Sequence, residues 1–413
     1  MKKIISAGII PVAAIIIVLC FSSCMKDKCS HSYKIYSPVY KTLSELRTGV
    51  QSKPAQAVEN TGKLFIRDKW IFLNEQNKGI HVINNADPSH PVKTSFINIP
   101  GNFDMYIKGN TLYADLYCDL VAIDISDPAH ITVSKYLTKT FPDKSTYTNS
   151  NNPDSITVLT GWNSRDTVAD CSVRLITGCA NCVYYAGSML SNATTAPSTT
   201  GAAGSMARFA AVNNYLYAVT THTLNVINIT NTASPLFVQG KKIGWNIETI
   251  FPYNNKLFIG AGSSMSVYDL QDPVNPQQST WNGHWCSHDP VIADDNYAYV
   301  TLHAANFCGS QVNQLEIYNL TGNTSQSPLI TYPLTNPLGL SKDGNLLFVC
   351  DDGLKLYDAT NVTDLKLLKH LPGINTYDVI ADGGIAYVVA KEGLLQYDYN
   401  DTKNIHLLSK ITK

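Results

Sequence analysis

A short pattern of alternating hydrophobic and polar residues recurs along most of the chain. Each copy has an apolar alternating stretch, a turn, and then a core of the form Leu-x-Val/Ile-Tyr/Ile-Asp/Asn. The seven cores begin at Ile80, Leu120, Leu224, Met265, Leu315, Leu354 and Leu394. The spacings from one core to the next are 40, 104, 41, 50, 39 and 40 residues. Because four of the six spacings agree within two residues, the chain is built on a repeat of about 40 residues.

Each repeat contains four stretches with the period of two that is typical of strands. In the second repeat these are Phe103–Lys108, Thr111–Tyr117, Leu120–Ile125 and Ile131–Leu137. The repeats contain no long segment of helical period, which excludes βαβ folds. Four strands in about 40 residues are typical of a propeller blade. The sequence therefore predicts an all-β fold, a seven-bladed β-propeller of four-stranded antiparallel blades.

The propeller is expected over residues 61–413, with the fourth strand of its last blade at Asn404–Ile411. Because the seventh repeat supplies its own fourth strand, we expect the first and last blades to close the ring by packing face to face. Before the ring, a short helix is predicted over Leu43–Val50. It is capped by Thr42, with Glu45 three residues further on.

The interval between the second and third repeats carries some 60 extra residues, at about 138–205, rich in Ser, Thr, Asn, Ala and Gly. A long loop insertion is the favoured interpretation, because the repeat core is absent there. A hidden eighth blade is the alternative, with strands at Ser155–Leu159 and Ser172–Ile176. Three cysteines lie in this interval, Cys171, Cys179 and Cys182. A disulfide between any two of them leaves the third cysteine over.

The N-terminal residues predict export and lipidation. A positive Met1-Lys2-Lys3 precedes an apolar run that ends in Phe21-Ser22-Ser23-Cys24, which resembles a bacterial lipobox. We expect residues 1–23 to be a lipoprotein signal peptide, Cys24 to carry acyl chains such as palmitate, and residues 24–60 to form a lipid-anchored tether and N-terminal segment. A permanent membrane-spanning helix is the alternative, but Pro11 interrupts the run and favours a removable signal.

The repeats resemble the LVIVD-repeat family of bacterial cell-surface proteins over about residues 61 to 413. The seven cores carry this resemblance together with three turn runs, Asp87–Pro91, Asp124–Pro128 and Asp272–Pro276. The resemblance implies a β-propeller at the cell surface and brings no established activity. With the lipobox, it predicts an outer membrane lipoprotein of a Gram-negative bacterium, on the cell surface or the periplasmic face.

Composition narrows the class further. Hydrophobic residues make up 44% of the chain, enough for a large core, and the net charge of −1 argues against electrostatic binding of nucleic acid. Ten cysteines suit an oxidising compartment. Cys286 and Cys308 flank a predicted hairpin in which Asp294 opposes Tyr297, a register that places the two thiols near enough for a disulfide. Cys350 is expected to be a buried free thiol.

Charged residues recur in register on the first strand of several repeats. Nineteen or twenty residues before the fourth core position stand Asp104, Arg208, Glu248 and Asp378, with Leu64 and Leu338 in the first and sixth repeats. His288 and Asp289 fit the same place in the longer fifth repeat. Since inner strands line the channel of a propeller, we expect an acidic ring at one mouth, with a divalent cation such as calcium or a cationic ligand. The alternative is that these side chains are solvated or bond to backbone N–H groups of neighbouring blades.

The sequence shows no Gly-x-Ser-x-Gly elbow, no phosphate-cradling glycine loop and no His-Glu-x-x-His, so it assigns no catalytic residue and identifies no cofactor. The leading interpretation is a binding or interaction scaffold for a protein or glycan. The alternative is a lyase or hydrolase at the channel mouth, with the carboxylates as acid, base or metal ligands and Arg208 holding an anion. Trp245, Trp281 and Trp285 either stack on a sugar ring or close gaps between blades.

Overall fold

The computed structural model describes residues 30–148, 150–170, 205–262, 264–283, 287–288, 290–304, 312–321 and 327–413. The chain divides into two compact units, one of residues 1–39 and 161–189, the other of residues 40–160 and 190–413. The described part of the first unit belongs to a two-stranded sheet of β1 (Ser30–Thr42) and β11 (Thr157–Asp170). Within the described residues, no helix has the length and apolar character needed to span a membrane.

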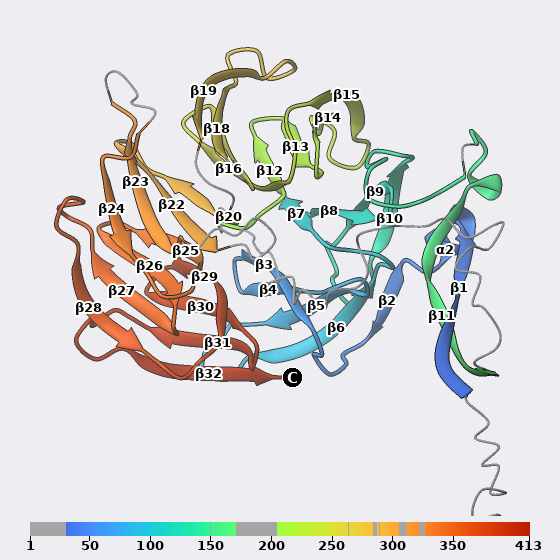
Figure 1. Cartoon of the computed structure of the whole chain (residues 1–413), viewed down its shortest axis with the longest axis horizontal. Coiled ribbons are helices and arrows are strands. Elements are labelled where there is room, and N and C mark those ends of the chain that lie inside the picture. The colour runs from blue at the N-terminus through green and yellow to red at the C-terminus, as the bar shows by residue number, and fades with distance from the viewer. Residues whose placement is uncertain are drawn as a thin grey trace, which may run out of the picture. The chain divides into compact units, whose positions relative to one another are not determined.

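The second unit is the predicted seven-bladed β-propeller, whose blades are antiparallel sheets of consecutive strands around a common centre (Figure 1). Blades one to four contain β3 (Thr61–Arg67), β4 (Trp70–Glu75), β5 (Gly79–Asn84), β6 (Val92–Asn98), β7 (Met105–Lys108), β8 (Thr111–Leu116), β9 (Asp119–Asp124), β10 (Thr132–Leu137), β12 (Phe209–Val212), β13 (Tyr215–Val219), β14 (Thr223–Asn228), β15 (Leu236–Lys242), β16 (Ile247–Tyr253), β17 (Lys256–Ala261), β18 (Ser264–Asp269) and β19 (Gln277–Gly283). Each of these blades corresponds to one sequence repeat.

Blades five to seven follow the same order, with a two-residue strand added to the fifth. They contain β20 (Ser287–His288), β21 (Val291–Ala293), β22 (Tyr297–Ala304), β23 (Gln314–Asn319), β24 (Ile330–Pro333), β25 (Pro337–Asp343), β26 (Leu346–Asp351), β27 (Leu354–Asp358), β28 (Lys366–Leu371), β29 (Thr376–Asp382), β30 (Ile385–Ala390), β31 (Gly393–Asp398) and β32 (His406–Thr412). The insertion adds no eighth blade in the part of the chain described. Of the strand predicted over Ser155–Leu159, the last three residues begin β11, which pairs with β1, while Ser155 ends a 3-10 helix.

The hairpin register expected in the fifth blade is confirmed. Val291 pairs with Val300, and the Asp294 amide donates to the Tyr297 carbonyl at 2.9 Å. Cys286 and Cys308, the predicted disulfide pair, lie outside the described residues. Cys118 and Cys350 are free and buried, as expected for Cys350.

The segment before the first blade adds a fifth strand to it. The predicted helix is present as α2 (Leu43–Thr48), and Thr42 and Glu45 form the expected reciprocal capping box. β2 (Gln51–Pro54) then pairs antiparallel with β6, the outermost strand of blade one. A 3-10 helix, η1 (Pro153–Ser155), lies in the first part of the insertion.

The ring closes by face packing, as predicted. Leu64 and Leu73 of blade one share a buried cluster with Val389 and Leu394 of blade seven. Alternate residues of each strand point to opposite faces, and both faces of a blade are covered by neighbours, so the inner strands are apolar on both sides. Hydrophobic burial between blades therefore holds the ring together.

In three blades, a buried acidic side chain on the second strand holds the loop that precedes the inner strand. Glu75, Asp115 and Asp351 lie at or next to the last residue of the second strand in blades one, two and six, and all three are buried. Each carboxylate accepts two consecutive backbone amides from the loop that leads into its own blade, at 2.6–2.9 Å. These loops approach the centre of the ring, so their fixed geometry positions the groups found there.

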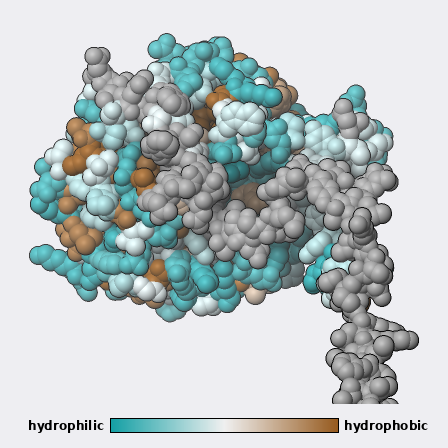
Figure 2. Space-filling view, in the orientation of Figure 1, coloured by the Kyte–Doolittle hydropathy of each residue, from teal (hydrophilic) through white to brown (hydrophobic). Residues whose placement is uncertain are grey.

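The coloured part of the face drawn in Figure 2 is mainly polar. On the face in Figure 2, hydrophobic groups are separated by hydrophilic ones, and one lies near β28, where Leu367 and Leu368 are 53% and 42% exposed. On another outer strand, β15, Leu236 and Phe237 are exposed by 58% and 47%. Scattered apolar side chains of this kind are normal on a soluble surface.

Candidate functional site

The end of the insertion lies at the centre of the propeller. Four residues, Ser205–Arg208, precede β12 and are here called the axial segment. Hydrogen bonds join Ser205 to Asp378 and Leu340, Met206 to Lys63, Ala207 to Ile250, and Arg208 to Asp104. These partners belong to blades one, two, four, six and seven. A segment that bonds to residues in or directly before the inner strands of five blades lies inside the ring, so the chain itself fills the centre at this level.

The carboxylate of Asp104 holds one end of the axial segment. Its Oδ2 accepts the Arg208 backbone amide at 2.6 Å and lies 3.0 Å from the Lys63 ammonium. Its Oδ1 accepts the Met105 amide at 2.7 Å. Lys63 also donates to the Met206 carbonyl at 2.6 Å. Both partners of this ion pair are buried, and three successive blades are thereby joined through one carboxylate.

The carboxyl group of Asp378 holds the other end. The Ser205 hydroxyl donates to its Oδ1 at 3.1 Å and accepts the Leu340 amide at 2.9 Å. The other oxygen, Oδ2, is buried without a hydrogen-bond partner among the described residues. Gly339 leaves the necessary room, because a Cβ there would lie 2.0 Å from Asp378 Oδ1.

Burial shifts the pKa values of the charged groups at the centre. It lowers the pKa of Lys63 to about 8, although the charge of Asp104 opposes the shift. It raises the pKa of Asp104, with Lys63 opposing, and the pKa of Asp378 to about 8, against smaller effects of the Val379 amide and Ser205. Asp378 is therefore mainly protonated at neutral pH. Desolvation by burial, ahead of any effect of neighbouring charges, is the main cause of the pKa shift at both carboxyl groups.

Lys63 was missed because a β-bulge changes the register of the first strand. Pairing between β3 and β4 shifts between Thr61 and Leu64, and similar shifts occur at Glu248 and beside Asp378. A bulge re-aims a side chain, so Lys63 enters the centre while Leu64 packs between blades. The sequence did hold one sign of this buried charge, because Lys63 directly precedes the apolar run Leu64-Phe65-Ile66.

The structure brings together only part of the predicted acidic ring. Asp104 and Asp378 are buried around the axial segment and do not line an open mouth, which corrects the expectation. Arg208 is half-buried, and its Nε donates to the Glu248 backbone carbonyl at 3.2 Å, while Glu248 itself is half-buried. The alternative of bonds to backbone N–H groups of neighbouring blades therefore holds for Asp104. The Asp289 residue, the His288 side chain and Cys24 lie outside the described residues.

The centre is suited to holding the chain in place. Among the described residues, no group of three or more His, Cys, Asp or Glu side chains is placed to hold a metal ion. Asp104 already has an ammonium beside it, and Asp115 has the Lys144 ammonium at 2.5 Å. A calcium site that includes Asp289 stays a prediction.

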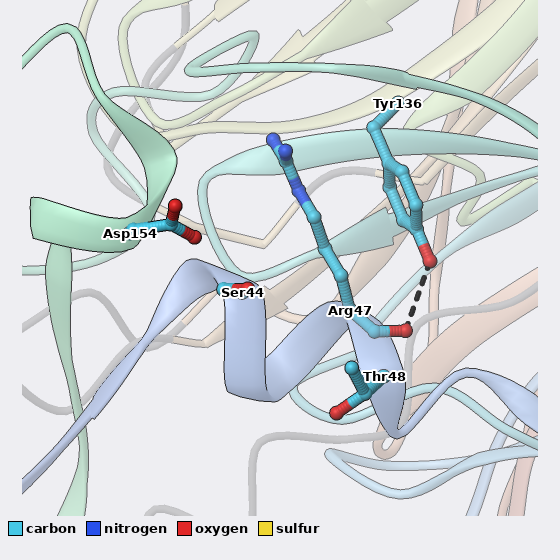
Figure 3. A pocket seen from close by; sticks show the side chains of 5 residues that line it. All are labelled: Ser44, Arg47, Thr48, Tyr136 and Asp154. Carbon is cyan, nitrogen blue, oxygen red and sulfur yellow. Dashed lines mark hydrogen bonds between the residues drawn. The ribbon is translucent and has the colours of Figure 1, made fainter.

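A cavity of about 410 Å³ lies beside α2 and is lined by residues from α2, β10 and η1 (Figure 3). Arg47 and Tyr136 lie side by side there, with the guanidinium 4.8 Å from the ring centroid and the Tyr136 hydroxyl donating to the Arg47 carbonyl at 3.0 Å. The guanidinium also bonds to buried Asp119 at 2.6 Å and to Thr138 at 2.7 Å. These contacts attach α2 to blade two, and sequence reasoning missed them because they join residues about 70 to 90 positions apart.

A second cavity, of about 280 Å³, lies between blade four and the loop that joins blades three and four. Trp245, in the loop that joins them, lines it and is 77% exposed. Trp245 therefore does not close a gap between blades, one of the two roles considered for it. The Trp281 side chain and Trp285 lie outside the described residues.

The chain resembles known propellers in fold. No protein-family model and no curated protein matches it. The periplasmic gluconolactonase PpgL of Pseudomonas aeruginosa is 12% identical, with 88% of this chain and 96% of that chain covered and a TM-score of 0.51. BamB of Moraxella catarrhalis is 8% identical, with 88% and 99% covered and a TM-score of 0.50. A protein of Lactobacillus plantarum is 10% identical, with 77% and 87% covered and a TM-score of 0.50. At these identities the likeness establishes the β-propeller fold alone.

Proposed function

We propose that this protein is a lipid-anchored binding scaffold of the Gram-negative envelope that presents one face of its propeller to a protein or glycan. Cys24 carries the acyl chains, and the following residues act as the tether. The lipobox pattern supports the anchor, and the repeat cores that resemble LVIVD proteins support a place at the outer membrane.

The observation that carries this proposal is the filled centre. Asp104 and Asp378, the two most deeply buried of the predicted site residues that the structure describes, both bond to the axial segment, and Asp104 also bonds to Lys63 of blade one. A lyase or hydrolase at the channel mouth needs carboxylates that reach a substrate. In the described residues these two carboxylates are used internally, and the geometry favours a rigid platform whose contacts lie on its surface.

The proposal is tested with the full chain expressed in a Gram-negative bacterium. Palmitate labelling and membrane fractionation of wild type and Cys24→Ser test the anchor, and protease treatment of intact cells distinguishes the surface from the periplasmic face. Both labelling and membrane association are expected to disappear in Cys24→Ser. Retained labelling in that variant contradicts the lipid assignment.

Binding itself is tested by quantitative cross-linking in native membranes, with competition from untagged full chain. We expect a saturable partner whose capture is unchanged in Glu248→Gln, because the half-buried carboxylate is not needed by a scaffold. Absence of any saturable partner, or substrate turnover that is lost in Glu248→Gln, contradicts the proposal and favours the enzyme alternative.

A further inference from the structure

The cavity between blade four and the Trp245 loop has the features of a ligand site. Three of its lining residues, Ile247, Ile259 and Tyr268, are nearly fully buried and belong to the apolar cluster that blade four shares with blade three. Ser264, Ser266 and Gln278 add hydroxyl and amide groups at its edge. Although several of these side chains are apolar, the accessible surface of the cavity is more polar than apolar, which suits a ligand that carries several hydroxyl groups.

Trp245 is held so that its indole remains available. It lies in the loop between β15 and β16, where Asn246 adopts a left-handed backbone at φ 51°. The His222 ring, from blade three, packs against it with centroids 4.7 Å apart and planes at 55°. Despite this support, the side chain is 77% exposed. A large aromatic surface that is fixed by a neighbour and left open to solvent is available for stacking.

The chemistry of the walls selects an uncharged ligand. None of the described residues that line the cavity carries a formal charge at neutral pH. The Gln278 amide donates to Ser266 Oγ only at 3.4 Å, so both groups keep hydrogen-bonding capacity for a ligand. A purely apolar side chain seated here would desolvate these polar groups without replacing their bonds, at a cost in affinity.

The size of the cavity limits the ligand further. A volume of about 280 Å³ corresponds to roughly nine water molecules, which is room for one sugar ring and its hydroxyls. A pyranose has an apolar C–H face that stacks on an indole and a rim of hydroxyls that bond to serine and glutamine side chains.

We propose that the Trp245 cavity binds one neutral pyranose ring of a glycan. This inference rests on the proposed binding function and names its ligand class and site. The sugar stacks on Trp245, and its hydroxyls replace water at Ser264, Ser266 and Gln278. With one ring buried, affinity for a monosaccharide is expected to be about millimolar.

The test uses the full chain in detergent with glucose, galactose, mannose and N-acetylglucosamine as probes. Tryptophan fluorescence and saturation-transfer NMR give the affinity and the bound face. We expect at least one sugar to bind saturably, with about tenfold weaker binding in Trp245→Ala and a smaller loss in Trp245→Phe, which keeps a ring. Trp162→Ala is the matched control, because Trp162 is also exposed, by 49%, but belongs to the first unit.

Two results overturn the inference. One is that none of the four sugars binds saturably to wild type at concentrations up to ten times the expected dissociation constant. The other is that Trp245→Ala binds as wild type does while its thermal unfolding is unchanged. A leucine-rich peptide is run in parallel. If the peptide binds in a Trp245-dependent way and the sugars do not, the sugar assignment fails while the scaffold function stands.

Discussion

The ammonium of Lys63 lies 3.0 Å from Oδ2 of Asp104, although the two residues belong to different blades and both are buried. The same carboxylate oxygen accepts the Arg208 amide, and Lys63 also bonds to Met206. One ion pair thus joins blades one and two to the segment that enters blade three. Because neither charge reaches water, the contribution of this pair differs from that of a surface salt bridge.

Breaking this pair should destabilise the propeller strongly. We expect Lys63→Met to lower the free energy of unfolding by about 3–5 kcal/mol, since Asp104 then remains buried without its counter-ion. Urea denaturation measures the change. The control is Lys366→Met, which removes an exposed bridge to Asp364 and should cost less than about 1 kcal/mol. Equal costs for the two variants would contradict the structural role of Lys63.

Asp378 should make stability depend on pH. Its pKa is raised from 3.8 to about 8 by burial, so the folded state holds a proton that the unfolded state releases. The resulting stability is fully present below about pH 4 and is lost as pH rises through about 8, at up to about 1.4 kcal/mol per pH unit.

In Asp378→Asn the side-chain amide does not titrate. The free energy of unfolding should therefore fall less steeply between pH 5 and 8, roughly the range between the unfolded and folded pKa values of Asp378. Urea unfolding at a series of pH values measures the slope. Lys63, whose pKa is lowered from 10.5 to about 8, changes protonation on unfolding mainly above that range. An unchanged slope in the variant shows that Asp378 is ionised in the folded protein at neutral pH.

Gly339 should not tolerate a methyl group. A Cβ at this position would lie 2.0 Å from Asp378 Oδ1 and 2.8 Å from the Asp378 Cα, and the backbone cannot give way as a flexible side chain does. Gly339→Ala is expected to cost about 1–3 kcal/mol by overpacking. Gly161→Ala, where a Cβ meets nothing within 4 Å, is the control and should be nearly neutral. Thermal unfolding of the two variants side by side decides the matter.

Ring closure should depend on the apolar contact between the first and last blades. Leu64 is fully buried in the cluster they share, and Leu64→Ala is expected to lower the free energy of unfolding by about 2–5 kcal/mol. Leu407→Ala, at a position 47% exposed, should stay within about 0.5 kcal/mol. Similar costs in denaturant titrations would argue against closure by face packing.

Much of the fold was predictable because it repeats. Period-two patterning and turn residues placed the strands of the second blade within two residues of their observed ends, as at Thr111–Leu116 and Thr132–Leu137. The capping box of Thr42 and Glu45 was predictable for the same local reason. Face packing of the ring followed from the count of strands in the last repeat.

The centre was less predictable because its contacts are not local. Asp378 bonds to a residue 173 positions away, and Lys63 to one 143 positions away. The sequence placed Asp104, Arg208 and Asp378 at equivalent positions but gave no sign that Ser205–Arg208 enters between them. Counting residues also fails at a bulge, which is why Leu64 was placed where Lys63 is found.

The central claim is that the propeller axis is filled by the axial segment, and amide hydrogen exchange at Arg208 tests it most directly. The Arg208 amide donates to buried Asp104 at 2.6 Å, so it should exchange as slowly as core amides such as that of Val388. The Trp245 amide, in an exposed loop, serves as the fast reference. Exchange of Arg208 at the rate of Trp245 would show that the axis is open and would contradict this account.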